Sequence, residues 1–366
     1  MMTSIADFID RARNKFIPAF IGLMLLAGLP GLPAAAEEIL PAGQENTPAP
    51  VKLINREYID TVTVNHPLFV DLLENGNYLV CRVGFNAPSV QEIDPAGRVV
   101  WSIDGVQPVS ARRLPGGNTL VADSGAPGLP YAPRVLEVSP AGKVVWEHRF
   151  ASLAESPRYA EKLANGNILV TLPFMIVELD RQHRVVWSYG SRKPLSPDSA
   201  GYLERPVMAA GLANGNVLVV DRGFAGGRVL EINKSKQVVW QFGRRLAELR
   251  FSSGVPAVTG DRVEAERSVP EFLPAPSYAC RLENGNTLVT DLGTSRLVEI
   301  DGKGNIAREL DWSAALLGYP VMNTWQAALA GDRLLPVFTL TNSHSRILEL
   351  DINNLPALNR GGASET

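Results

Sequence analysis

The sequence has 366 residues, of which 45% are hydrophobic and 20% are charged. This balance is typical of a globular protein and excludes a largely disordered chain. The 35 basic and 38 acidic side chains leave a net charge of −3. Because no basic field is available to attract phosphate backbones, nucleic acid is excluded as an expected partner.

Residues 1–36 have the pattern of a secretory signal peptide. Three basic side chains at positions 11–15 precede an apolar run over residues 16–32, and alanines at 34–36 then offer a cleavage site. We therefore predict a periplasmic mature protein with no membrane span. The alternative is an uncleaved anchor, but the run is short for a span and is interrupted by proline.

The segments on either side of the main domain have simple compositions. Residues 37–56 are rich in Pro, Ala and Glu, which predicts a flexible lead-in. Residues 356–366 are expected to form a disordered tail. The domain itself is predicted to cover residues 57–355.

Six copies of one sequence unit fill this domain. Each copy contains a leucine that is followed in most copies by an Asn-Gly pair, namely Leu73, Leu114, Leu163, Leu212, Leu282 and Leu329. Each copy also contains a glutamate near the end of a later apolar run, namely Glu92, Glu137, Glu178, Glu231, Glu299 and Glu349. A Val-Val-Trp phrase follows in the first four copies, ending at Trp101, Trp146, Trp187 and Trp240. The three landmarks agree on six units.

Each unit has the pattern of four antiparallel strands, which we name a to d. An Asn-Gly pair between two apolar runs predicts a tight a–b hairpin, because both residues tolerate positive φ. A second Gly-containing turn precedes Val-Val-Trp and joins strands c and d. Six four-stranded units of this length predict an all-β protein, a six-bladed β-propeller.

An N-terminal strand is expected to close the ring. The last unit has no good fourth strand, whereas residues 58–64 form an additional strand before the first unit. We predict that residues 58–64 are the outer strand of the last blade. Such closure removes an exposed sheet edge.

The two cysteines are expected to be free. Cys81 and Cys280 fall in predicted strands of units that are not neighbours in the ring. We therefore predict two buried thiols and no disulfide.

Propeller geometry sorts the connections onto two faces of the ring. The a–b and c–d turns lie on one face, which we name the short-turn face. The b–c and d–a connections lie on the other face, and the long ones, residues 190–204 and 243–274, make it the loop-rich face. Long loops on a rigid scaffold usually carry function. Candidate ligand-binding residues at the mouth of this face are Gln107, Ser156, Arg158 and Arg205, with the aromatic residues Tyr159, Tyr278 and Trp325.

The most repeated polar residues are interpreted as blade architecture. In three units an Asp at the end of strand b occurs together with an Arg three residues before the landmark Glu. The pairs are Asp123 with Arg134, Asp221 with Arg228, and Asp291 with Arg296. This co-occurrence predicts an Asp–Arg pair that ties the b–c loop within each blade. The landmark glutamates are assigned to blade structure, and the tryptophans to packing between blades.

Histidine is scarce, with four copies in the chain. His66 lies at the start of the first strand a, and His344 lies in the last b–c loop, so both are candidate catalytic residues on the loop-rich face. A histidine near Arg205 could act as nucleophile or general acid–base on an anionic substrate. His148 and His183 are expected to face solvent.

No cofactor or metal is expected. The sequence has no His-x-x-x-His, no closely spaced cysteine pair and no calcium-binding loop. It also has no Gly-rich phosphate loop and no Gly-x-Ser-x-Gly elbow.

Two phrases within residues 114–146 resemble the blades of arylsulfotransferase-type propellers. The first is Leu-Pro-Gly-Gly-Asn-Thr-Leu-Val-Ala-Asp, and the later one is Arg-Val-Leu-Glu-Val-Ser-Pro-Ala-Gly-Lys-Val-Val-Trp. The blades are also similar to those of NHL-repeat and PQQ-like propellers. The first resemblance implies a periplasmic six-bladed propeller that transfers sulfate between phenols through a histidine. On this chain it implies His66 as nucleophile, with Arg205 and Arg158 holding the anion.

Three functions therefore stay open. The favoured one is a periplasmic propeller, expected to be monomeric, that binds a small anionic or aromatic molecule or a protein partner through its loop-rich face. The alternative is an arylsulfotransferase-like enzyme, and the second alternative is a PQQ-dependent oxidoreductase.

Overall fold

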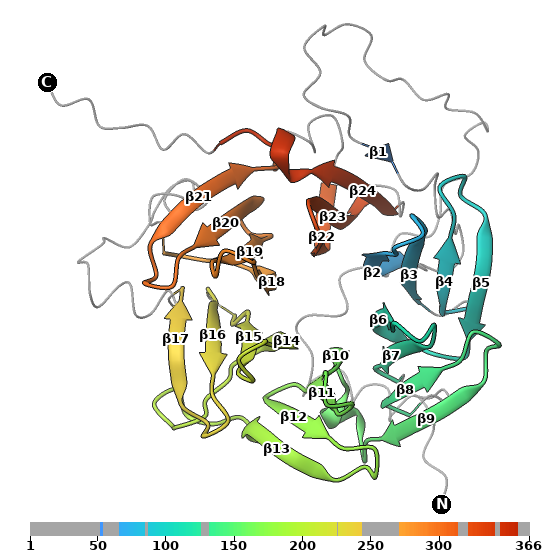
Figure 1. Ribbon diagram of the computed structural model, residues 1–366, viewed down its shortest axis with the longest axis horizontal. Coiled ribbons are helices and arrows are strands. Elements are labelled where there is room, and N and C mark those ends of the chain that lie inside the picture. Colours follow the sequence, from blue (N-terminus) through green and yellow to red (C-terminus); the bar gives the residue numbers. More distant parts are fainter. Residues whose placement is uncertain are drawn as a thin grey trace, which may run out of the picture. The chain divides into compact units, whose positions relative to one another are not determined.

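Six four-stranded antiparallel sheets are arranged around a common axis (Figure 1). The structure is a computed structural model that describes residues 52–53, 66–84, 87–125, 132–224, 226–243, 271–313, 321–340 and 345–357. The chain divides into two units, residues 1–46 and 47–366, and all the described residues lie in the second. The predicted six-bladed propeller is confirmed.

The strands follow the chain blade by blade. Blades 1 to 3 contain β2 (His66–Leu72), β3 (Tyr78–Val83), β4 (Ser89–Ile93), β5 (Val99–Asp104), β6 (Pro108–Arg113), β7 (Thr119–Asp123), β8 (Arg134–Val138), β9 (Val144–Arg149), β10 (Tyr159–Lys162), β11 (Ile168–Thr171), β12 (Met175–Leu179) and β13 (Val185–Gly190). Blades 4 to 6 contain β14 (Pro206–Gly211), β15 (Val217–Asp221), β16 (Arg228–Ile232), β17 (Val238–Phe242), β18 (Pro276–Arg281), β19 (Thr287–Asp291), β20 (Arg296–Ile300), β21 (Ile306–Asp311), β22 (Val321–Ala330), β23 (Arg333–Leu340) and β24 (Ser345–Asp351).

Helical structure is limited to single turns in the described ranges. The 3-10 helices η1 (Leu153–Glu155) and η3 (Ile352–Asn354) connect strands. Within the described ranges, no helix has the length and apolar character needed to cross a membrane.

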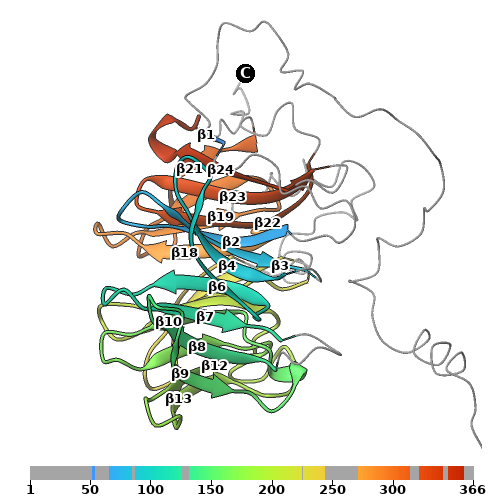
Figure 2. The ribbon, with the colours of Figure 1, turned by 90° about the vertical axis from the view of Figure 1, so that its right-hand side faces the viewer.

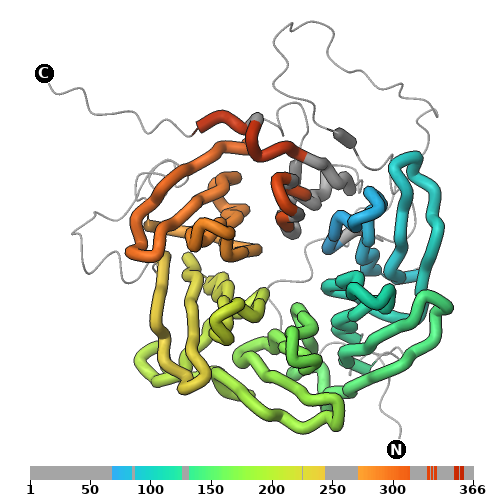
Figure 3. The backbone as a smooth tube through the Cα atoms, in the orientation of Figure 1, coloured from blue at the N-terminus to red at the C-terminus, as the bar shows by residue number. Residues whose placement is uncertain are grey.

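Strand a of every blade lies nearest the axis and strand d lies at the rim (Figure 3). Seen from the side, the strands run between the two faces of the ring (Figure 2). Strands a, b and c carry most of the buried apolar side chains of the described residues, which form one large cluster and three smaller ones. Each residue of strand a therefore has a defined height between the loop-rich face and the short-turn face.

The a–b hairpins differ from the predicted geometry in one respect. The glycines have positive φ, for example 80° at Gly76 and 85° at Gly285, but the preceding asparagines do not. The N–H of Gly76 donates to the carbonyl of Leu73, which closes a turn before the left-handed residue. The side chain of Asn75 stabilises the turn instead, because it accepts a hydrogen bond from the N–H of Asn77 at 3.0 Å.

An N-terminal strand closes the ring, and in the described part of the chain it lies before the predicted residues. The outer strand of blade 6 is β1 (Lys52–Leu53), which pairs antiparallel with β24 through Glu349 and Leu348 (Figure 1). Residues 58–64 lie outside the described residues. The closing strand therefore lies within the segment that was predicted to be a flexible lead-in. The sequence did not indicate it because two residues are too few to show a strand pattern.

Both cysteines are free, as predicted. Cys81 is buried, whereas Cys280 is only partly buried, which corrects the expectation of two buried thiols. Burial raises the pKa of the Cys280 thiol to about 11 and raises that of Cys81 as well. Both thiols are therefore protonated at neutral pH.

Each of the first four blades is joined to the next through its landmark glutamate. Glu137 accepts a hydrogen bond from Asn118 of its own a–b hairpin at 2.7 Å. Its second oxygen accepts from Lys162 at 3.0 Å and from Arg181 at 2.8 Å, both of blade 3. Burial acts to raise the pKa of Glu137, but these donors outweigh it and lower the pKa. The corresponding bonds between blades are Arg113 to Glu92, Lys234 to Glu178 and Arg281 to Glu231. We name this arrangement the glutamate latch.

The Val-Val-Trp tryptophans complete the same junctions. Trp146 donates its indole N–H to the carbonyl of Arg181 in the next blade, at 3.2 Å. The guanidinium of Arg181 also lies over the Trp146 ring, 5.3 Å from its centroid. Trp101 and Trp187 donate to carbonyls of the next blade in the same way. The predicted role of these tryptophans in packing between blades is confirmed.

Two histidines expected to face solvent lie together at the junction of blades 2 and 3. The ring of His183 stacks on Trp146 with centroids 5.1 Å apart, and it lies 5.7 Å from the ring of His148. His148 also meets Phe150 edge to face at 5.0 Å. Burial and the charge of His183 lower the pKa of His148, against the opposing charge of Glu155.

Neutralising one latch carboxylate is expected to destabilise the ring. Glu137→Gln removes a charge that is 4% exposed and leaves Lys162 and Arg181 without their carboxylate partner. We expect the free energy of unfolding in urea at pH 7 to fall by about 2 kcal/mol.

The matched control for this change is Glu299→Gln in blade 5. Glu299 pairs with Arg308 of its own blade, whose side chain is 43% exposed, so solvent can replace the lost contact. We expect a loss of less than about 1 kcal/mol. Equal losses in the two variants would contradict the role of the latch between blades.

The His148 contacts predict a stability that depends on pH. A lowered pKa means that the folded protein resists a proton that the unfolded chain accepts. The free energy of unfolding should therefore fall as the pH drops from 7.5 through the ordinary value of 6.5. His148→Gln should have a shallower pH dependence over this range in urea titrations, and identical slopes would exclude the effect.

Candidate functional site

The Asp–Arg pairs that were predicted from the repeat fix the backbone where strand a begins, on the loop-rich face. In blade 4 the carboxylate of Asp221 accepts from the backbone N–H of Arg205 at 2.8 Å and from Nε of Arg228 at 3.3 Å. Arg228 in turn donates to the carbonyl of Tyr202 at 2.7 Å. Blades 2 and 5 repeat this brace with Asp123–Arg134 and Asp291–Arg296. The prediction of a structural pair is confirmed.

Three arginines lie together where blades 3, 4 and 5 meet this face. Arg158 follows the end of the blade 2 to blade 3 connection, and its guanidinium donates to the carbonyl of Pro206 at 3.0 Å. Arg205 directly precedes β14, and Arg222 directly follows β15. The backbone N–H of Arg222 donates to the carbonyl of Arg205 at 3.1 Å, which holds the two residues side by side. We name Arg158, Arg205 and Arg222 the arginine cluster.

The charges of the cluster oppose one another. Burial and then the charge of Arg205 lower the pKa of Arg158 to about 10, against the opposing charge of Asp221. Burial and then Arg205 also lower the pKa of Arg222. None of the three forms a salt bridge with a described residue, because the nearby Asp221 is engaged by Arg228. Among the described residues, the cluster is therefore a positive charge without a carboxylate partner of its own.

An exposed aromatic ring stands beside the cluster. Phe224, in the connection between β15 and β16, is 76% exposed. The guanidinium of Arg205 lies over its ring, 5.6 Å from the centroid. The preceding Gly223 has a φ of 63°, and a Cβ atom there would come within 2.2 Å of the carbonyl oxygen of Gly226. The close turn that this glycine permits is what presents Phe224 at the surface.

Sequence reasoning named Arg158 and Arg205, and the structure brings them together. It missed Arg222 and Phe224. The available signal was a break in the repeat, since the residue after the strand-b Asp is Ser124 in blade 2, Leu292 in blade 5 and a charged arginine only in blade 4. Such a departure points to a role outside blade architecture.

Two other candidate ligand-binding residues, Gln107 and Ser156, form hydrogen bonds with the protein backbone through their side chains. The side chain of Gln107 donates to the carbonyl of Gly84 at 2.7 Å and accepts from the N–H of the same residue at 3.4 Å. Ser156 donates to the carbonyl of Ser124 or of Leu153, each at 2.8 Å. These contacts join neighbouring connections, and a role of either residue in ligand binding stays a prediction.

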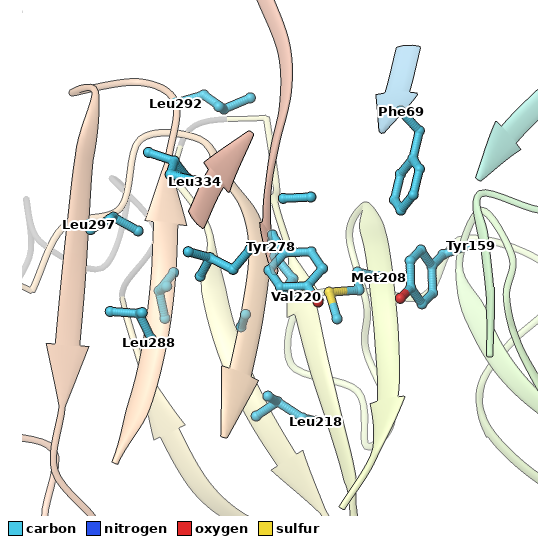
Figure 4. Packing of buried hydrophobic residues seen from close by; sticks show 14 of the residues in the cluster. Phe69, Tyr159, Met208, Leu218, Val220, Tyr278, Leu288, Leu292, Leu297 and Leu334 are labelled. Atoms are coloured by element: carbon cyan, nitrogen blue, oxygen red, sulfur yellow. The ribbon is translucent and has the colours of Figure 1, made fainter. Parts of the chain in front are cut away.

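The two tyrosines lie on the axis rather than at the mouth. Tyr159 is 2% exposed and Tyr278 is 5% exposed, and both belong to the main apolar cluster together with Met208 and Phe69. Figure 4 shows their hydroxyl groups pointing toward each other, with Met208 between them. Among the described residues, they form part of a buried apolar layer near the axis.

For the remaining candidates, the structure describes the backbone of two residues and nothing of the third. His66 begins β2, where it pairs with Val83, and Trp325 lies in β22, but the side chains of both are outside the described set. His344 lies outside the described residues altogether. Their proposed roles stay predictions. Across the described ranges, no group of three or more His, Cys, Asp and Glu side chains is arranged to hold a metal ion.

Comparison with solved structures finds other propellers. The chain is similar to a catalytically inactive variant of virginiamycin B lyase from Staphylococcus aureus solved with quinupristin, with 12% identity and a TM-score of 0.53 over 82% of this chain and 100% of that chain. It is also similar to a streptogramin B lyase structure, with 11% identity and a TM-score of 0.50 over 82% and 88% of the two chains. No protein-family model matches the sequence, and no curated protein matches it. At these identities the likeness shows the propeller fold alone.

Proposed function

We propose that this protein is a periplasmic propeller that binds a small aromatic anion at the arginine cluster on its loop-rich face. The observation that carries the proposal is the set of three guanidiniums without a carboxylate partner among the described residues. Like charges held together on a rigid scaffold repel one another, and a bound anion relieves that repulsion. The signal-peptide pattern of residues 1–36 supports the periplasmic location.

The geometry favours an anion with oxygen acceptors. Guanidinium groups recognise sulfate, phosphate and carboxylate oxygens through charge-assisted hydrogen bonds. The backbones of Arg205 and Arg222 are fixed by the Asp221 brace and by their mutual hydrogen bond. Little conformational freedom in the backbone is therefore lost when an anion binds, which favours affinity.

The ring of Phe224 favours an aromatic group on the same ligand. The Phe224 side chain is 76% exposed, so its ring is accessible to a ligand that binds beside Arg205. An aryl ring that stacks on Phe224 would place its acidic substituent next to Arg205. Phenyl sulfate has both features and is a suitable probe.

Binding of phenyl sulfate should depend on the cluster. In isothermal titration calorimetry we expect Arg205→Gln and Arg222→Gln each to weaken binding by about tenfold or more, since each removes a charge-assisted hydrogen bond. Phe224→Ala should weaken phenyl sulfate binding while leaving the weaker binding of inorganic sulfate unchanged.

Arg184→Gln is the control for these variants. Arg184 lies in a c–d turn on the short-turn face, its side chain is 73% exposed, and it pairs only locally with Asp180. Phenyl sulfate affinity that is equal in the Arg184, Arg205 and Arg222 variants would refute the site. Release of free phenol in the presence of a second phenol is followed in the same samples, because sulfate transfer would show an enzyme instead of a binding protein.

A further inference from the structure

A second group of charged side chains surrounds the axis close to the short-turn face. Each residue in this ring lies two positions before the hairpin leucine of its blade. The described members are Asp71, Arg112, Glu161, Ala210 and Cys280. All are partly exposed, whereas the residues one layer deeper are buried. Solvent therefore reaches this ring from the short-turn face and stops at the next layer.

The deeper layer is an apolar floor with two unpaired hydroxyl groups. It consists of Phe69, Ser110, Tyr159, Met208 and Tyr278, each between 1% and 5% exposed. The rings of Phe69 and Tyr159 lie 6.2 Å apart across the axis. The hydroxyls of Ser110 and Tyr159 are buried and have no hydrogen-bond partner among the described residues. Buried hydroxyls usually have a hydrogen-bond partner, and these two groups keep their hydrogen-bonding capacity for a bound molecule.

Arg112 is the centre of the ring. Its guanidinium donates to the carboxylate of Asp71 at 2.9 Å, and its side chain remains 29% exposed. Its pKa is raised first by Tyr159 and, against its burial, also by Tyr278, Asp71 and Glu161. The group therefore lies near side chains from blades 1, 3 and 5. In the described part of the chain, its remaining N–H groups have no partner.

Glu161 supplies an open acceptor beside this open donor. One of its oxygens accepts from the backbone N–H of Gly211 at 3.2 Å, and no other donor reaches the carboxylate within the described ranges. Burial raises its pKa to about 7, against the lowering effects of Arg112 and of the Gly211 N–H. The ring thus presents an available cation and an available carboxylate next to each other.

We propose that this partly exposed ring near the short-turn face binds a small zwitterion, such as a free α-amino acid. The ligand carboxylate binds Arg112, and the ligand ammonium binds Glu161. The side chain of the ligand rests on the floor of Phe69, Tyr159 and Met208. A simple anion meets the charges of Asp71 and Glu161, and a simple amine meets Arg112, so only a ligand with both charges satisfies the ring.

Calorimetry with matched fragments tests this proposal on the full mature chain. The probes are L-alanine, which carries both charges, ethylamine, which lacks the carboxylate, and propionate, which lacks the amine. We expect L-alanine to bind at least tenfold more tightly than either fragment, because each end makes a charge-assisted hydrogen bond. Equal affinity for the three probes, or no binding of L-alanine, would overturn the proposal.

Two variants separate the ends of the ligand. Glu161→Gln keeps the shape and the acceptor for Gly211, and it should weaken L-alanine binding by about tenfold or more. Removing Arg112 alone would leave Asp71 unpaired, so the second variant is the double change Asp71→Asn and Arg112→Gln. It should lose L-alanine binding while its thermal unfolding confirms a folded protein. Unchanged binding in either variant would refute the assignment.

Proton release gives a readout that a purely structural Glu161 would not affect. The carboxyl of Glu161 is partly protonated near pH 7, and an ammonium ligand favours its ionised form. L-alanine binding at pH 7 should therefore release protons, seen as a binding enthalpy that depends on the buffer, and its affinity should increase toward pH 8. The other titratable groups facing the ring are Asp71, Tyr159, Tyr278 and Cys280, and Glu161→Gln isolates the contribution of Glu161.

The two sites can fail independently. Arg222→Gln should weaken phenyl sulfate binding by about tenfold or more and leave L-alanine binding unchanged, and Glu161→Gln should do the reverse. Loss of both ligands in one variant would indicate a general structural defect instead of two sites.

Discussion

The glutamate latch is the interaction on which the rest of this propeller depends. A carboxylate such as Glu137 is only 4% exposed, so each of its hydrogen bonds replaces one that water would otherwise make. One oxygen holds the a–b hairpin of its own blade, and the other holds a cation of the next blade. A single side chain therefore fixes both the turn of one blade and its distance from the neighbour. Repetition around the ring gives a scaffold whose strands have defined heights along the axis.

The latch and the Asp–Arg brace together use the polar residues that recur in the repeat. The polar residues that neither of them uses lie at positions where a blade departs from the repeat. On the loop-rich face these are Arg222 and Phe224, next to Arg158 and Arg205. On the short-turn face they are Arg112 and Glu161, where other blades have Ala210 or Cys280. Because architecture already satisfies the repeated groups, the unrepeated ones remain available to ligands.

Strand β10 and the residue before it connect the two proposed sites. Arg158 belongs to the arginine cluster, Tyr159 belongs to the apolar floor, and Glu161 belongs to the ring below it. Along this short segment, the buried Tyr159 thus lies between a cationic site and a mixed-charge site. Phe69, Tyr159 and Tyr278, which lie between the two levels, are buried. Each site can therefore select its own ligand chemistry.

The sequence by itself determined the number of blades, the strand order and the architectural roles of the repeated Glu, Asp, Arg and Trp residues. These features are local or periodic, so patterns of apolar residues and glycine turns record them. Tertiary structure decided which blade positions meet. It placed β1 (Lys52–Leu53) beside β24, brought Arg222 to Arg158 and Arg205, and stacked His183 on Trp146. Such contacts depend on register and on packing between blades, and no pattern within a single unit encodes them.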